Sequence, residues 1–125
     1  MRNLKAAVLT ALVSVSVLTS QAAFAADKQW DKFLGEFRSA LAKSDKAKIA
    51  DMTKIPYYYD NGFLNREQYI KKIDVIFPKD VKAGLARNKP VRDKDGSYMI
   101  FNDDLIYVFN KVKGEYKFTD ISVDD

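Results

Sequence analysis

Apolar residues recur every three or four positions along residues 27–43. This spacing predicts an amphipathic helix with a single apolar stripe. Asp27 and Asp31 suit the first turn of that helix and Lys43 suits the last, because the helix dipole favours acidic groups at its start and basic groups at its end. The stripe consists of Trp30, Phe33, Leu34, Phe37, Ala40 and Leu41.

Capping residues predict two more helices. Ser44-Asp45 interrupts the first helix and offers an N-cap for a short helix over residues 46–52. Asn65, with Gln68 three positions later, is typical of a capping box at the start of a third helix. The apolar face of this third helix consists of Tyr69, Ile70, Ile73, Ile76 and Phe77.

Pro78 ends the third helix, because its ring blocks a further helical turn. Asp80 can cap one more short helical turn through Leu85. The last third of the chain is rich in β-forming residues, and the tight turns between its strands predict an antiparallel meander. The predicted strands are residues 91–92, 98–101, 105–109 and 116–123.

An earlier β-prone stretch covers residues 55–59 and is followed by Asn61-Gly62. Asparagine and glycine tolerate the positive φ that a type I′ turn requires, so this pair predicts a two-residue hairpin turn. Phe63-Leu64 would then begin the returning strand. Helices, a hairpin, further helices and a strand meander together predict one α+β domain over residues 26–125.

A family resemblance rests on three stretches of the chain. The residues that carry it are Phe37-x-x-x-Leu41-x-x-Ser44-Asp45-Lys46-x-x-Ile49-Ala50-x-Met52-x-x-Ile55-Pro56, then Asn65-Arg66-Glu67-x-Tyr69-Ile70, then Ile73-Asp74-x-Ile76-Phe77. With the closing strand meander, this pattern resembles small exported domains of the NTF2-like (cystatin-like) superfamily. The resemblance implies N-terminal helices packed on a curved antiparallel β-sheet that encloses a conical cavity. Members include ketosteroid-isomerase-like enzymes, dehydratases and binding or dimerisation modules, so the fold alone selects no function.

The first 25 residues are typical of a cleavable signal peptide. Arg2 and Lys5 form a positive start, and residues 6–18 form an apolar core. Residues 23–25 (Ala-Phe-Ala) place small side chains where a signal peptidase reads them. The alternative is a membrane anchor, but spanning a bilayer needs about 20 apolar residues and this core is shorter. The sequence therefore predicts cleavage after Ala25 and export to the periplasm or the medium.

Removing that signal peptide changes the charge of the chain. The full sequence has 21 basic and 17 acidic side chains, and the loss of Arg2 and Lys5 leaves 19 against 17, a net charge of +2. Nucleic acid is therefore not expected as a partner. The chain has no histidine and no cysteine, which excludes Ser-His-Asp and Cys-His nucleophiles and thiolate or imidazole zinc sites. No catalytic residue, metal ligand or cofactor is assigned.

Tyr57-Tyr58-Tyr59 is the most unusual local feature. On a strand, Tyr57 and Tyr59 share one face and Tyr58 points to the other. One interpretation makes the face of Tyr57 and Tyr59 part of an aromatic ligand pocket. The other places half of the triplet in the core and half over an edge, as suits aromatic residues on strands. The residues of the candidate ligand pocket are Tyr57, Tyr59, Tyr69, Ile73, Asp74, Phe101 and Tyr107.

Asp74 lies among apolar residues and invites comparison with the general base of a ketosteroid-isomerase-like enzyme. Helical geometry places Asp74 about 100° from the centre of the apolar stripe, at its boundary. A boundary salt bridge or capping contact is the favoured interpretation. The missing histidine also counts against an enzyme of this kind.

Two charged stretches have ordinary alternatives. Residues 93–96 (Asp-Lys-Asp-Gly) resemble a calcium loop in composition, but Gly96 arrives at the fourth position where an EF-hand has it at the sixth, so a hairpin turn is favoured. Five basic residues within 14 positions predict either a contact patch for an anionic partner or a solvated face. They are Lys79, Lys82, Arg87, Lys89 and Arg92.

These observations favour an exported, non-catalytic NTF2-like domain that binds a small apolar ligand or a protein partner, with no membrane span and with a homodimer as one form it could take. The alternatives are an isomerase- or dehydratase-like enzyme that uses a pocket Asp or Tyr, and an inhibitor or immunity-type interaction protein of the cell envelope.

Overall fold

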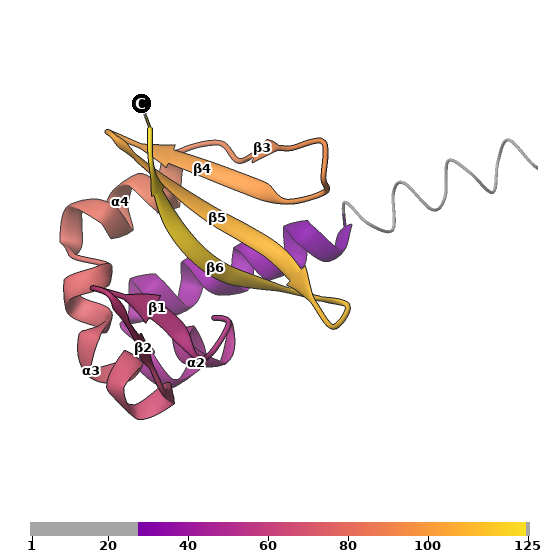
Figure 1. Ribbon diagram of the computed structural model, residues 1–125. Coiled ribbons are helices and arrows are strands. Elements are labelled where there is room, and N and C mark those ends of the chain that lie inside the picture. Colours follow the sequence, from indigo (N-terminus) through magenta and orange to yellow (C-terminus); the bar gives the residue numbers. More distant parts are fainter. Residues whose placement is uncertain (1–27, 125) are drawn as a thin grey trace, which may run out of the picture. The chain divides into compact units, whose positions relative to one another are not determined.

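The computed structural model describes residues 28–124 (Figure 1). The signal peptide predicted at residues 1–25 lies outside the described residues, so its assignment stays a prediction. Residues 28–32 and residues 33–125 belong to two different compact units of the chain. The packing described below is that of the unit that begins at Phe33. Among the described residues, no helix has the length and apolar character needed to cross a membrane.

The described helices follow the predicted order. A leading helix covers residues 28–43, and three others follow it: α2 (Lys46–Asp51), α3 (Arg66–Ile76) and α4 (Lys79–Arg87). The predicted caps are confirmed. The Asp45 side chain accepts a hydrogen bond from the backbone N–H of Lys48 at 3.2 Å. Asn65 and Gln68 form both bonds of a capping box, each of 2.9 Å.

The last helix differs from its prediction. Pro78, and not Asp80, is the N-cap of α4, and the helix continues to Arg87, so the prediction of one short turn capped by Asp80 is wrong. Asp80 lies in the first turn, where its charge complements the helix dipole. The helix α4 is longer than predicted because its buried side chains pack on β4 (Tyr98–Asn102). Local capping signals do not reveal such a tertiary contact.

The predicted antiparallel meander is confirmed. The four-stranded sheet has the order β3-β4-β5-β6, and every neighbouring pair is antiparallel. Its strands are β3 (Val91–Arg92), β4, β5 (Leu105–Val112) and β6 (Glu115–Val123). The predicted turn at Lys113-Gly114 adopts positive φ at both residues, 55° and 84°. Helices followed by a curved antiparallel sheet make this an α+β fold.

The first hairpin forms one residue earlier than predicted. Strands β1 (Tyr57–Tyr59) and β2 (Gly62–Leu64) pair so that Tyr59 faces Gly62. The turn residues are Asp60 and Asn61, with φ of 51° and 65°. Aspartate tolerates this left-handed conformation almost as well as asparagine. The turn can therefore use Asp60, and Gly62 becomes a strand residue.

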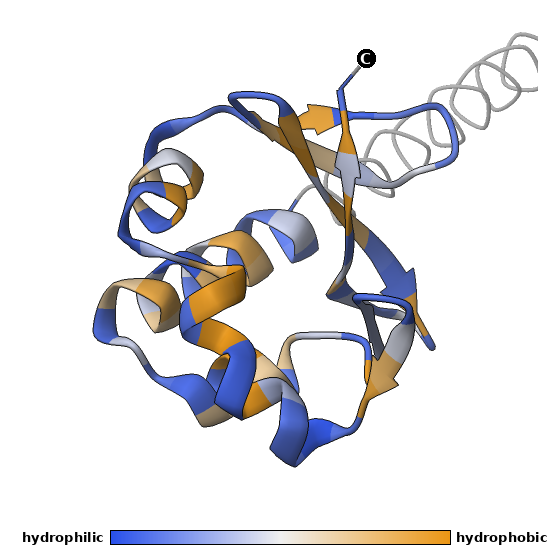
Figure 2. Ribbon diagram, turned by 60° about the vertical axis from the view of Figure 1, so that its left-hand side comes forward, coloured by the Kyte–Doolittle hydropathy of each residue, from blue (hydrophilic) through white to orange (hydrophobic). Residues whose placement is uncertain are grey.

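An aromatic core fills the space between the sheet and the helices, which gather on one side of it (Figure 2). Phe118 on β6 lies at its centre and is fully buried. Its ring centroid is 5.2 Å from that of Phe77 and 5.6 Å from that of Phe109. The backbone of Phe118 also pairs with the segment after α2, donating to Met52 O at 2.8 Å and accepting from Lys54 N at 2.9 Å. One strand thus joins the sheet to the helical layer.

Candidate functional site

Four of the seven candidate pocket residues lie together in the core. Tyr57 is 3% exposed, and Tyr69, Ile73 and Tyr107 are at most 1% exposed. The ring centroids of Tyr57 and Tyr69 are 5.1 Å apart, and the Tyr57 ring stacks on Phe118 at 5.6 Å. The protein's own side chains therefore occupy the space around these residues. Their role in ligand binding stays a prediction.

The other three candidates are placed differently. Tyr59 is half-buried at the end of β1. Phe101 is 38% exposed and pairs with Ile106, so it points to the face of the sheet opposite Tyr107. Asp74 is exposed on α3 and forms an ion pair with Lys46 at 3.0 Å. The structure does not bring Phe101 and Asp74 to the buried tyrosines, and Asp74 has the surface salt bridge favoured from helical geometry.

Two buried hydrogen bonds near these tyrosines were not predicted from the sequence. The Thr53 hydroxyl donates to Ile49 O at 2.8 Å and lies 2.8 Å from the Tyr69 hydroxyl. Either hydroxyl can be the donor in the second bond. Thr53 is only 4% exposed, and no sequence pattern distinguishes it from an ordinary loop threonine.

Burial raises the pKa of the Tyr57 and Tyr69 hydroxyls well above the usual range, and also raises the pKa of Tyr107. The pKa of Tyr57 is raised further by the nearby carboxylate of Asp120, and the Thr53 hydrogen bond only partly opposes the shift of Tyr69. These hydroxyls stay protonated at neutral pH. They can donate hydrogen bonds, but they are poor general bases.

The raised pKa values predict loss of stability in alkali. An unfolded tyrosine has a pKa of about 10, so the buried tyrosines keep their protons to higher pH when folded. Their contribution to the free energy of unfolding is complete below about pH 10 and falls as the pH rises above it. Tyr69→Phe is expected to flatten that fall in urea titrations between pH 8 and pH 11, whereas Tyr58→Phe, on an exposed ring, is expected to keep the wild-type slope. Equal slopes for Tyr69→Phe and the wild type would contradict this assignment.

The 93–96 segment forms the hairpin turn that was favoured over a calcium loop. Gly96 has a φ of 91° and donates to Asp93 O at 3.1 Å. The Asp95 carboxylate accepts bonds from the Ser97 hydroxyl at 2.6 Å and from its backbone N–H at 2.9 Å, and these bonds lower the pKa of Asp95. Within residues 28–124, no cluster of three or more acidic side chains could hold a metal ion.

The basic segment is partly engaged in the structure. The Lys82 ammonium donates to the Ser44 hydroxyl at 3.0 Å. The Arg92 guanidinium lies over the Tyr98 ring, 5.6 Å from its centroid. Two of the five basic residues thus have partners within the domain, which favours a solvated face over a single anion-binding patch.

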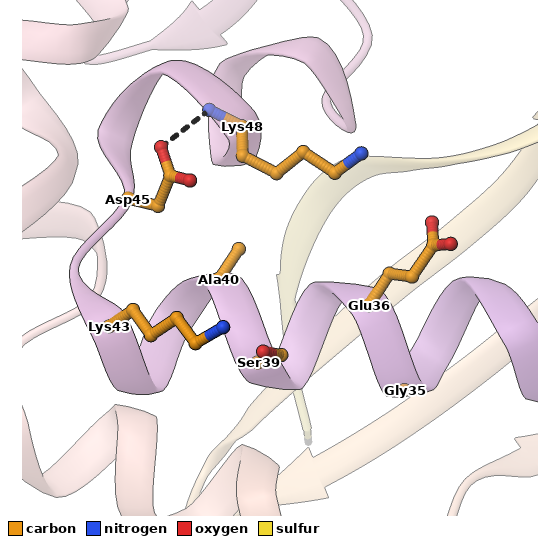
Figure 3. A pocket seen from close by; sticks show the side chains of 7 residues that line it. All are labelled: Gly35, Glu36, Ser39, Ala40, Lys43, Asp45 and Lys48. Carbon is orange, nitrogen blue, oxygen red and sulfur yellow. Dashed lines mark hydrogen bonds between the residues drawn. The ribbon is translucent and has the colours of Figure 1, made fainter.

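A groove of about 350 Å³ lies between the leading helix and the start of α2 (Figure 3). Its lining residues are Gly35, Glu36, Ser39, Ala40, Lys43, Asp45 and Lys48. The charges in it are of both signs, and Asp45 is already engaged as the cap of α2. None of the seven candidate pocket residues lines this groove, and four of its seven lining residues are charged, which does not suit an apolar ligand.

The most exposed aromatic residues form a pair on the hairpin. Tyr58 is 56% exposed and Phe63 is 66% exposed. The β1–β2 register places them directly opposite each other, and their ring centroids are 5.2 Å apart at an interplanar angle of 68°. The alternation of the tyrosine triplet predicted that Tyr58 points away from Tyr57. The pairing with Phe63 follows from the turn at Asp60-Asn61, which sequence reasoning placed one residue later.

No family model, no curated protein and no solved structure matches the chain.

Proposed function

We propose that the chain is exported and that its mature part, residues 26–125, is a non-catalytic NTF2-like domain that binds a protein partner. The three-part leader supports export. The order of helices before a curved antiparallel sheet supports the NTF2-like assignment. The protonated, closely packed tyrosines of the interior favour binding over catalysis.

The observation that carries the choice of a protein partner is the Tyr58–Phe63 pair. More than half of each of these two side chains is exposed to water. Exposed apolar area costs free energy unless a partner covers it. Aromatic residues also supply much of the binding energy in protein interfaces. A small apolar ligand would instead need room among Tyr57, Tyr69 and Tyr107, where the rings already pack on one another and on Phe118.

The test is native mass spectrometry of the tagged full chain. The chain is expressed in its own host and purified from the compartment in which it accumulates. We expect the chain to begin at Ala26 and to carry a stoichiometric protein partner. The double variant Tyr58→Ser/Phe63→Ser is expected to lose at least 100-fold in affinity, or about 2.7 kcal/mol. Val75→Ser, which alters an exposed valine on α3, is the matched control and is expected to keep the partner.

Three outcomes would contradict this proposal. They are a chain retained in the cytoplasm with its leader intact, a small molecule bound in place of a protein, and a partner that binds the double variant as tightly as the wild type.

A further inference from the structure

A second hollow, of about 220 Å³, lies beside the turn that joins β3 to β4. Its residues come from β3, from the turn, from the end of β5 and from the start of β6. Most cofactor and drug sites have volumes of roughly 300–1,000 Å³, so this smaller hollow suits a single small chemical group. Its lining residues are Arg92, Asp95, Gly96, Ser97, Asn110, Lys111 and Tyr116.

Aromatic rings position two cations in this hollow. Arg92 pairs with Tyr98 across the sheet, and its Cζ lies 5.6 Å from the centroid of that ring. Lys111 pairs with Tyr116, and its Nζ lies 5.3 Å from the centroid of that ring. The two tyrosines are buried, and their rings meet edge to face at 5.8 Å. Because cation–π contacts restrict both long side chains, less conformational entropy is lost when an anion binds to them.

The same hollow contains hydrogen-bond acceptors that are only partly used. Asp95 accepts both bonds from Ser97 at Oδ1, so its Oδ2 can accept further bonds. Asn110 donates from Nδ2 to Thr119 Oγ1 at 2.8 Å, and its amide oxygen can also accept. The two basic residues and the one acidic residue of the lining leave a net charge of +1. A matching ligand therefore carries a negative charge and also hydrogen-bond donors.

We propose that this hollow binds an acidic sugar residue, which combines a carboxylate with neighbouring hydroxyl groups. The carboxylate binds the planar guanidinium of Arg92 and the ammonium of Lys111, and the sugar hydroxyls donate to Asp95 and Asn110. A bare carboxylate such as acetate would meet the charge of Asp95 without offering it a donor. A neutral sugar would leave the two cations without an anion. The hollow shares no residue with the hairpin of β1 and β2, so this inference does not depend on the proposed function.

The test is titration of the isotope-labelled chain with galacturonate, followed through the chemical shifts of its backbone amides. We expect saturable shifts at the amides of Gly96, Ser97 and Lys111, with a dissociation constant on the order of 1 mM for a small ligand in a shallow site. Galactose lacks the carboxylate and acetate lacks the hydroxyl groups. Each of these two probes is expected to bind at least about 10-fold more weakly than galacturonate.

Four variants assign the binding to these side chains. Arg92→Met and Lys111→Met each remove one cation but keep an apolar stem over the tyrosine ring, and each is expected to weaken galacturonate binding about 10-fold. Asp95→Asn keeps an oxygen for the Ser97 bonds but removes the negative charge, so the preference for galacturonate over acetate is expected to fall about 10-fold. Lys94→Met alters a basic residue of the same turn that does not line the hollow. This control is expected to bind galacturonate like the wild type.

The spectrum of each variant without ligand shows whether the variant is folded. The absence of saturable shifts up to about 50 mM galacturonate, far above the expected constant, would overturn the proposal. Acetate or galactose that binds the wild type as tightly as galacturonate would also overturn it, as would folded Arg92→Met and Lys111→Met variants that both bind like the wild type. An equal loss in Lys94→Met would show that the positive charge of the whole turn, and not this hollow, attracts the anion.

Discussion

Replacement of Phe118 by alanine is expected to lower the free energy of unfolding by about 3–5 kcal/mol, the usual range for a fully buried phenylalanine. The side chain is fully buried and contacts the rings of both layers of the domain. Its ring neighbours are Phe37, Tyr57, Phe77, Tyr107 and Phe109. Close packing around a central ring allows little collapse, so most of the cavity is expected to remain open.

The measurement is urea unfolding followed by circular dichroism, with the midpoint and slope fitted separately. Phe63→Ala removes a ring of the same size from an exposed position and is expected to change the free energy of unfolding by less than about 1 kcal/mol. A loss of similar size in both variants would show that Phe118 is not the centre of the core. The comparison also separates packing from the general β-propensity of phenylalanine.

Local signals predicted most of the helices of this fold. The period-3.6 stripe of the leading helix and the caps at Asp45 and Asn65 depend on residues within one or two turns of each other. The strand meander was predicted for the same reason, because each turn lies between neighbouring strands. The full length of α4 was not predicted, because packing on β4 stabilises that helix. No local sequence pattern encodes such a tertiary contact.

The candidate site was only partly predictable, because side-chain position depends on register and on tertiary packing. Alternation correctly separated Tyr58 from Tyr57, but it could not decide which of the two faces would be buried. The Tyr58–Phe63 pair required the turn to lie at Asp60-Asn61, and a shift of one residue changes every cross-strand partner. Phe101 was grouped with Tyr107, although the β4–β5 register places them on opposite faces.

Arg38 connects two helices through hydrogen bonds that no sequence pattern indicates. From the leading helix, its Nε donates to Leu85 O at 2.8 Å and one of its terminal nitrogens donates to Asn88 O at 2.7 Å. The last carbonyls of a helix have no partner within that helix, and they carry the negative end of its dipole. Arg38 therefore caps the C-terminus of α4 from outside. Burial lowers the pKa of its guanidinium from the ordinary value, as expected for a cation held between two helices.

We expect Arg38→Met to lower the free energy of unfolding by about 2–4 kcal/mol, because two charge-assisted hydrogen bonds are lost and two carbonyl groups are left poorly solvated. Arg38→Lys is expected to lie between this variant and the wild type, since lysine keeps the charge but not the forked geometry that reaches both carbonyls. Urea unfolding measures the loss of stability. The Asn88 amide bonds to Gly84 O, so faster hydrogen exchange at this amide would locate the loss in α4.

The control for this experiment is Arg66→Met, which breaks the exposed ion pair with Asp51 at 3.0 Å and is expected to cost at most about 1 kcal/mol. If the free energy of unfolding falls by the same small amount in both methionine variants, Arg38 acts only as a surface charge. If Arg38→Met loses several times more and the Asn88 amide exchanges faster while amides of α3 do not, the capping role is established. The same contact would then be a second reason, beside the packing on β4, why α4 continues past Leu85 to Arg87, because its terminal carbonyls are bonded before the chain turns toward β3.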